Sequence, residues 1–172
     1  MILADTSAWV EHDRATGSAV DRRLSQLISK DGPVAVTEPV MMEVLAGARD
    51  EVRQHELRRL LLRFEMLRFD VVVDFDAAVT IYRRCRGQGV TPRGLIDCMI
   101  ASVASRHGAV LLAHDADLAR IALVMDLELD HVSLGAGADP DLGVLISCAH
   151  DKADSAPASG WTGGAPGCRG GG

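Results

Sequence analysis

The sequence predicts an α/β protein in which a short, mostly parallel sheet is covered by helices on both faces. The first observation is that short apolar runs occur at residues 2–4, 34–36 and 109–113. Such runs are typical of strands that are buried on both faces of a parallel sheet. The second observation is that segments with helical spacing of apolar residues separate these runs, as the crossovers between parallel strands require. We therefore expect one domain over residues 1–133.

Residues 134–172 differ in composition from the rest of the chain. They are rich in Gly, Ala and Ser, and their one brief apolar patch lies at residues 144–148. So little apolar surface cannot offset the conformational entropy that an ordered chain loses. We expect this segment to be a disordered tail.

The composition limits the classes of function. A formal net charge of −6 argues against a nucleic-acid binder with a uniform positive field, although an acidic site that binds a cation would be neutralised in use. The four cysteines form no CxxC pair, which argues against a zinc site or a disulfide framework. No apolar run approaches the roughly 18 residues of a membrane span. The chain also begins without the basic head of a signal peptide, so we expect a cytoplasmic protein with no membrane partner.

Helices are expected where apolar residues recur every three or four positions between a start signal and a stop signal. Asp5, Thr6 and Ser7 offer three possible N-caps for the first helix, and Pro39 and Gly47 mark the start and end of the third. The expected helices begin after Ser7 and then occupy residues 18–29, 37–46, 49–68, 74–86, 94–106 and 114–125. Strand-like runs follow the fourth and the last of these helices, at residues 69–73 and 127–132, the second as an edge strand.

One acidic residue lies within the most apolar helix. Residues 94–106 leave almost no polar face, so this helix should be buried nearly all round, yet it contains Asp97. Moving an ionised carboxylate out of water without a partner costs several kcal/mol or more, so a cation, hydrogen-bond donors or a shifted pKa must compensate. A cap or a favourable helix-dipole interaction in the first turn is the alternative explanation for Asp97.

Four further acids are placed in a similar way. Glu43 has three apolar residues on each side, and Asp5, Asp115 and Asp117 follow buried strands. The carboxyl ends of parallel strands meet at the edge where open α/β folds bind their ligands. Carboxylates gathered there would repel one another unless a positive charge lies among them. Oxygen ligands without a His/Cys set suit Mg²⁺ or Mn²⁺, while capping remains the alternative role for residues 5–7.

Together these acidic motifs resemble those of PIN domains of the VapC toxin type. They occur in the family's order over residues 1–133: a strand followed by Asp5-Thr6-Ser7, Glu43 in Met-Glu-Val-Leu-Ala-Gly, Asp97 in Ile-Asp-Cys-Met-Ile-Ala, and Asp115-Ala-Asp117-Leu. The four-part pattern is much more specific than any one motif. Leu118, where an aromatic residue is common, and the Gly-rich tail depart from the family's pattern.

The resemblance implies a PIN-like three-layer α/β/α fold and a Mg²⁺- or Mn²⁺-dependent endoribonuclease that cuts tRNA, rRNA or mRNA. It implies an acidic quartet that also binds the metal, formed by Asp5, Glu43, Asp97 and Asp117. Asp115 would be an auxiliary acid and metal ligand, and Thr6 or Ser7 would position water or metal. The expected partners are a second copy of the chain and a VapB-type antitoxin. A segment of the antitoxin would enter the site, and the protein would contact DNA only through the antitoxin.

The chemistry expected of such a site is metal-assisted hydrolysis. One or two ions would polarise the scissile phosphate and lower the pKa of a bound water, while a carboxylate accepts the proton. Attack by water rather than by the ribose 2′-hydroxyl predicts a product with a 5′-phosphate. Arg93, one turn before Asp97, could contact the substrate phosphate or the antitoxin. The alternative is an ion pair that simply neutralises Asp97.

Three other interpretations are open at this stage. A receiver or an aspartate-nucleophile phosphatase also places acids at strand ends, but normally needs a Lys in the site, and the two lysines are Lys30 and Lys152. Cleavage of RNA by histidines needs a converging pair, whereas the six histidines are scattered. A catalytically inactive, metal-stabilised PIN fold that only binds an antitoxin is the third interpretation, and measured RNA cleavage would separate it from the enzyme.

Overall fold

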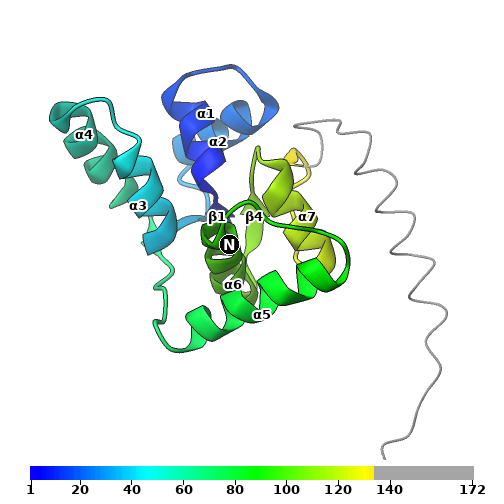
Figure 1. The fold of residues 1–172 in the computed structure, drawn as a ribbon. Coiled ribbons are helices and arrows are strands. Elements are labelled where there is room, and N and C mark those ends of the chain that lie inside the picture. Colours follow the sequence, from blue (N-terminus) through cyan, green and yellow to red (C-terminus); the bar gives the residue numbers. More distant parts are fainter. Residues whose placement is uncertain (134–172) are drawn as a thin grey trace, which may run out of the picture. The chain divides into compact units, whose positions relative to one another are not determined.

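The computed structural model describes residues 1–133, so the prediction of a disordered tail falls outside the described residues. Figure 1 shows the chain from the blue N-terminal strand to the yellow end of the last helix. Four strands form one parallel sheet in the order β3-β2-β1-β4. They are β1 (Ile2–Ala4), β2 (Val34–Val36), β3 (Glu65–Met66) and β4 (Val110–Leu112). The predicted α/β fold with a short parallel sheet is confirmed.

Helices make up most of the described chain. They are α1 (Thr6–Asp13), α2 (Ala19–Ser29), α3 (Glu38–Ala46), α4 (Glu51–Leu61), α5 (Val73–Gly87), α6 (Leu95–His107) and α7 (Ala116–Met125). Helix α1 packs on α2 and α3, and α3 packs on α4, whereas α5, α6 and α7 pack on one another. Right-handed crossovers explain these two groups, because the chain moves from β1 to β3 in one direction and returns to β4 in the other. By this rule the two groups belong to opposite faces of the sheet, and α3 of the first group also contacts α6 of the second.

The same topology creates a switch point between β1 and β4. The chain leaves β1 toward β2 on one side, while β4 lies on the other side of β1. Register is fixed by pairs such as Leu3 with Leu111, and the backbone N–H of Asp5 donates to the carbonyl of Leu112 at 2.9 Å just beyond the strands. Open α/β sheets bind ligands at the carboxyl ends of strands beside such a point.

The fourth helix is shorter than predicted, and a strand lies where its last turn was expected. Helix α4 ends at Leu61, and β3 (Glu65–Met66) pairs with β2 instead. The side chain of Phe64 packs against Trp9 with ring centroids 5.3 Å apart, and the N–H of Leu67 donates to Val36 at 2.8 Å. The helical spacing of residues 64 and 67 was therefore misleading, because a two-residue strand has too little periodicity to be recognised.

The strand predicted at residues 69–73 is wrong, because Asp70 turns the backbone into helix α5. Its carboxylate accepts from the N–H groups of Val72 and Val73, both at 2.9 Å. In return, the Asp74 carboxylate accepts from the N–H of Asp70 at 2.7 Å. This reciprocal pairing satisfies N–H groups that a new helix leaves unpaired, and it outweighs the strand propensity of three consecutive valines.

The edge strand predicted at residues 127–132 is reduced to one bridge, between Leu111 and Leu129. Pairing stops because Asp130 makes a turn: its carbonyl accepts from the N–H of Ser133 at 2.8 Å, and its carboxylate accepts from Arg23 at 3.0 Å. Between residues 1 and 133, no helix combines the length and the apolar composition that crossing a membrane would need.

Helix α6 is less completely buried than its composition predicts. Residues 100–104 are buried, but Leu95 is exposed and Ile96 and Asp97 are half-buried. The first turn of the most apolar helix thus opens to the surface, which brings Asp97 within reach of solvent. The thiols of Cys85 and Cys98 are buried and unbridged, as expected of incidental cysteines.

Candidate active site

Asp5 lies at the switch point, immediately after β1. Its side chain is buried and caps α1: Oδ2 accepts from the backbone N–H of Ser7 at 3.0 Å and from the Ser7 hydroxyl at 2.6 Å. Burial raises the pKa of Asp5 above its ordinary value, against these hydrogen bonds, and the charge of Glu43 raises it further. The predicted cap is thus real, and it occupies only one of the two carboxylate oxygens.

Thr6 and Ser7 connect Asp5 to two other elements. The Thr6 hydroxyl donates to Glu43 Oε2 at 2.6 Å, which links the start of α1 to α3. The Ser7 hydroxyl accepts from the backbone N–H of His114 at 2.8 Å while it donates to Asp5. The Thr6 hydroxyl therefore holds an acid of α3, and the Ser7 hydroxyl links the carboxyl ends of β1 and β4.

Asp97 experiences the charge of every other candidate acid. Its pKa is raised from 3.8 to about 7, first by burial and then by repulsion from Asp5, Asp115, Glu43 and Asp117. Helices α3 and α6 pack on each other, which brings the segments carrying Glu43 and Asp97 together. The structure thus gathers the five carboxylates predicted from sequence into one electrostatically coupled cluster, which we call the acidic cluster.

Asp115 and Asp117 have different surroundings within the acidic cluster. Asp115 is exposed and caps α7, its Oδ1 accepting from the N–H of Asp117. Asp117 is buried, and each of its oxygens meets a guanidinium group: Oδ1 lies 2.9 Å from Arg120 Nη1, and Oδ2 lies 3.1 Å from Arg93 Nε. Arg93 therefore pairs with Asp117 and not, as the alternative explanation held, with Asp97.

Three buried polar atoms of residues 1–133 have no hydrogen-bond partner: Asp5 Oδ1, Thr37 Oγ1 and His114 Nδ1. All three residues lie at the carboxyl end of the sheet, after β1, β2 and β4. The register pairs Leu3 with Ala35, so two residues further on Asp5 lies beside Thr37. Leaving a buried polar group unpaired costs about 1–3 kcal/mol, and such exceptions mark sites that complete their hydrogen bonds with something else.

Sequence reasoning missed Thr37 and Arg120. Thr37 was expected only as the first residue of the third helix, and its side chain makes no cap hydrogen bond there. Its role depends on the parallel register, which no local pattern reveals. Arg120 could have been found, because it lies three residues after Asp117 on the same helix, where side chains meet.

Among residues 1–133, no three Asp, Glu, His or Cys side chains are arranged to hold one ion as they stand. The donor set nevertheless suits Mg²⁺, which keeps several waters and often binds through one or two carboxylates. Asp5 Oδ1 is a buried carboxylate oxygen without a partner, which a cation would satisfy. The residues present therefore fit a divalent ion.

A lysine-dependent phosphoryl-transfer site is not supported by the described residues. Lys30 is exposed at the end of α2, and the chain continues from there into the amino end of β2. That is the edge of the sheet opposite to the acidic cluster. Lys152 lies outside the described residues.

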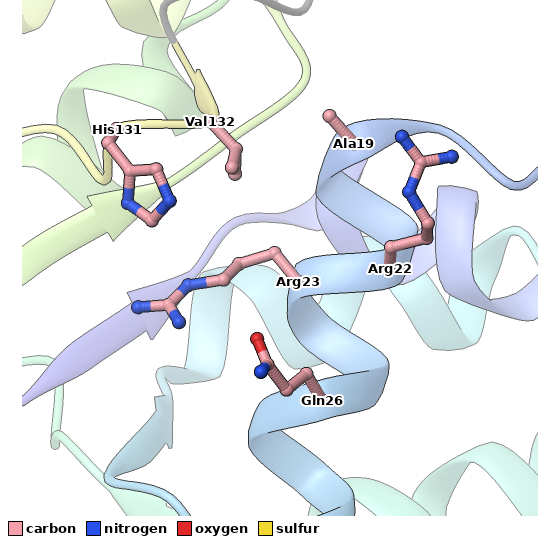
Figure 2. Close-up of a pocket in the computed structure, with 6 residues that line it drawn as sticks. All are labelled: Ala19, Arg22, Arg23, Gln26, His131 and Val132. Atoms are coloured by element: carbon pink, nitrogen blue, oxygen red, sulfur yellow. The ribbon is translucent and has the colours of Figure 1, made fainter.

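Figure 2 shows a separate pocket of about 350 Å³ on α2, lined by Ala19, Arg22, Arg23, Gln26, His131 and Val132. It contains none of the acidic cluster. Arg23 and His131 both face the buried carboxylate of Asp130, at 3.0 and 3.1 Å, whereas the guanidinium group of Arg22 donates to the carbonyl of Gly17. It does not add to the candidate active site.

Comparison with known proteins identifies the family. The sequence profile of the PIN domain matches residues 2–124. The chain is also 44% identical over 129 residues to ribonuclease VapC11 of Mycobacterium tuberculosis, an alignment that covers 74% of this chain and 96% of that protein. The chain belongs to the VapC family of PIN domains. The VapC ribonuclease Mb1587 of Mycobacterium bovis matches this PIN domain to the same extent.

Solved structures agree on the fold of this PIN domain. VapBC2 of Rickettsia felis, in a crystal structure bound to a DNA fragment from its promoter, superposes with a TM-score of 0.60 at 20% identity. The match covers 76% of this chain and 98% of that one. At this identity the likeness establishes the fold only.

The raised pKa of Asp97 predicts how the stability of this PIN domain depends on pH without metal. The folded chain retains the Asp97 proton up to about pH 7, whereas the unfolded chain loses it near 3.8. The folded state therefore binds more protons between these values, and its stability falls as pH rises from about 4 to 7 and then levels off. After discounting for partial exposure, we expect a loss of about 1–2 kcal/mol between pH 5 and 8 in chelator.

Urea unfolding of the parent and Asp97→Asn across this range measures the effect. The parent should lose stability relative to the variant as pH rises. Acids with lowered pKa, such as Asp21 and Asp74, titrate below this window, and the histidines are common to both proteins. Parallel pH profiles for parent and variant would contradict the assignment of the high pKa to Asp97.

Proposed function

We propose that the chain is a toxin of a type II toxin–antitoxin system and a Mg²⁺- or Mn²⁺-dependent endoribonuclease that cuts tRNA, rRNA or mRNA. The observation that carries the proposal is the acidic cluster at the switch point, where burial, together with repulsion from four other carboxylates, raises the pKa of Asp97 to about 7. Such crowding is unfavourable unless a cation binds there. The kinship to VapC ribonucleases supports RNA as the substrate.

Asp5, Glu43 and Asp97 would hold the ion. Asp5 contributes Oδ1, since its Oδ2 is occupied by Ser7, and the Thr6 hydroxyl orients Glu43 by its 2.6 Å hydrogen bond. Asp115, which is exposed, and Asp117, which pairs with two arginines, are the other two ligands that the resemblance implies. When bound, a divalent ion polarises the scissile phosphate and lowers the pKa of water.

The chain's own groups supply proton transfer and positioning. A carboxylate beside the ion can accept the proton of the attacking water, and we assign this role to Asp97, which lies among the other acids of the cluster. Thr6 and Ser7 fix the two acids beside it by hydrogen bonds, which limits their reorganisation during the reaction. Attack by water leaves the phosphate on the 5′ end of the downstream product.

Incubation of purified protein with total cellular RNA tests this function. We expect cleavage with Mg²⁺ or Mn²⁺, none with EDTA, and product 5′ ends that are substrates for a 5′-phosphate-dependent exonuclease. Calorimetric titration with Mn²⁺ should show binding to the protein alone. Equal cleavage in EDTA, or 5′-hydroxyl ends, would contradict the metal mechanism. Mn²⁺ binding without any cleavage would support the inactive antitoxin-binding PIN fold instead.

We further propose a VapB-type antitoxin and a second copy of the chain as partners. The Rickettsia felis neighbour is VapBC2 bound to a DNA fragment from its promoter, which supports an antitoxin partner. Contact with DNA only through the antitoxin is part of the proposal. A site that cuts RNA would act in the cytoplasm. Co-expression with a cognate VapB-type antitoxin should abolish RNA cleavage and yield a complex that co-purifies.

A further inference from the structure

An acidic cluster presents an electrostatic problem for an RNA-cutting enzyme. Five carboxylates surround the place where the phosphates of the substrate must arrive. One divalent ion offsets only part of this charge, and RNA is itself strongly negative. Cationic side chains at the rim of the cluster would therefore be needed to attract and position the phosphates. The ones that the structure places there are Arg93 and Arg120, both on Asp117.

Arg93 is unusual because a highly exposed side chain is held by a buried acid. Its side chain is 81% exposed, whereas that of Asp117 is 6% exposed. The contact runs from Nε, so the two terminal Nη atoms lie at the far end of a side chain that is mostly in solvent. Arg93 also lies next to Gly94, the N-cap residue of α6, whose first turn contains Asp97. A guanidinium group fixed in this way is directed to the rim of the site.

Neutralising Asp117 does not require Arg93. The other oxygen of Asp117 already lies 2.9 Å from Arg120, whose side chain is only 20% exposed and which belongs to the same helix. An exposed ion pair also contributes little to stability, with a screened charge and a cost in side-chain entropy. A role in stability therefore does not explain the second arginine.

We propose that Asp117 is a positioning residue that holds Arg93 at the rim of the acidic cluster, where Arg93 contacts an RNA phosphate. Asp117 would thus form ion pairs with the two arginines rather than bind the metal ion, and Arg120 would fix the orientation of its carboxylate. Arginine suits this role because its planar fork matches phosphate oxygens and one nitrogen can remain on the carboxylate. The proposal rests on the proposed ribonuclease function.

Arg49 provides a matched control. Its side chain is 83% exposed, and its Nε lies 3.1 Å from the carboxylate of the neighbouring Asp50, the same contact that Arg93 makes. Asp50, however, is half-exposed and is not among the charges that act on Asp97. Arg49→Gln therefore removes the same charge from an equivalent surface pair away from the acidic cluster.

Binding of a fluorescein-labelled oligouridine of about twelve nucleotides, measured by anisotropy in EDTA at several salt concentrations, tests the contact without cleavage. Relative to the parent, Arg93→Gln should bind about three- to tenfold more weakly at low salt. Its plot of log affinity against log salt should be flatter by about 0.7, the loss of one phosphate contact on a single strand. Arg49→Gln should keep the parental slope, and Arg93→Lys should restore most of it.

Two further measurements test the role of Asp117. Asp117→Asn should weaken oligouridine binding, and the double variant with Arg93→Gln should be no weaker than Arg93→Gln alone, because both changes remove one contact. Calorimetric titration with Mn²⁺ should show that Asp117→Asn retains affinity within about threefold, whereas Asp97→Asn loses binding. If Asp117→Asn instead lost Mn²⁺ affinity to the same extent as Asp97→Asn, Asp117 would be a metal ligand. That result would overturn its assignment as a positioning residue.

The outcomes separate this inference from the proposed function. Identical salt slopes for Arg93→Gln and Arg49→Gln, in a parent that cleaves RNA with Mn²⁺, would overturn the phosphate contact and leave the ribonuclease intact. A flatter slope only for Arg93→Gln, in a parent that never cleaves RNA, would support the contact and refute the enzyme.

Discussion

Replacing Asp97 by Asn is expected to lower kcat/KM for RNA cleavage about a thousandfold, within the range of roughly 10² to 10⁴ that a positioned proton acceptor supplies. The amide keeps the shape of the side chain but can neither accept a proton nor offer an anionic oxygen to a cation. Cleavage of a labelled RNA with Mn²⁺ at neutral pH measures the change. The variant lacks the charge that the other carboxylates repel. It should therefore fold and be more stable than the parent in chelator above pH 7.

The matched control for this variant is Asp76→Asn. Asp76 also lies in the first turn of a helix, α5, so the substitution removes a comparable charge from a comparable position. Asp76 is exposed, and its charge is not among those that raise the pKa of Asp97. The cleavage rate of Asp76→Asn should therefore stay within about twofold of the parent. An Asp97→Asn protein that cleaves within tenfold of Asp76→Asn would contradict the catalytic role of Asp97.

Replacing Asp74 by Ala is expected to lower the free energy of unfolding by about 3–5 kcal/mol. The Asp74 side chain is fully buried and accepts from Arg106 Nε at 3.0 Å, from Arg106 Nη2 at 2.7 Å, and from the N–H of Asp70. Removing the carboxylate leaves the guanidinium group with only the carbonyl of Arg68 as an acceptor, and it removes the acceptor of the Asp70 N–H. Urea unfolding of parent and variant measures the change.

Two comparisons make the Asp74 prediction specific. Asp76→Ala, two residues further along α5 and exposed, should change stability by no more than about 0.5 kcal/mol. The double variant with Arg106→Ala should lose less than the sum of the single variants, because both changes break the same pair. Since Arg106 lies at the opposite end of α6 from Asp97, Mn²⁺ affinity should be retained while the variant is folded. A loss below 1 kcal/mol would show that the buried pair is not a main support of this region.

Local patterns in the sequence accounted for most of the fold. The apolar runs that became β1, β2 and β4, and most of the helices, were predictable because burial on both faces and helical periodicity are written into neighbouring residues. The five acids of the cluster were predictable for a related reason. Each stands out locally, either directly after a buried strand or within an apolar helix, and parallel strands bring their carboxyl ends to one edge.

The structure was needed wherever a residue's role depends on a distant partner. The strand β3 forms only because two residues reach β2, and the strand predicted at 69–73 fails because the carboxylate of Asp70 caps a helix. Periodicity cannot weigh these competing hydrogen bonds over such short stretches.

By itself, the sequence determined that one α/β domain would place five acids at the carboxyl edge of a parallel sheet. Only the tertiary structure decided how they are shared. Among residues 1–133, Asp97 has no basic partner and is repelled by its neighbours, Asp117 lies between Arg93 and Arg120, and Thr37 is buried without a partner beside Asp5. The physical reason is that charge pairing acts over a few ångströms in space. Residues 93 and 117 come within that distance only after the sheet has set its register and packed its helices.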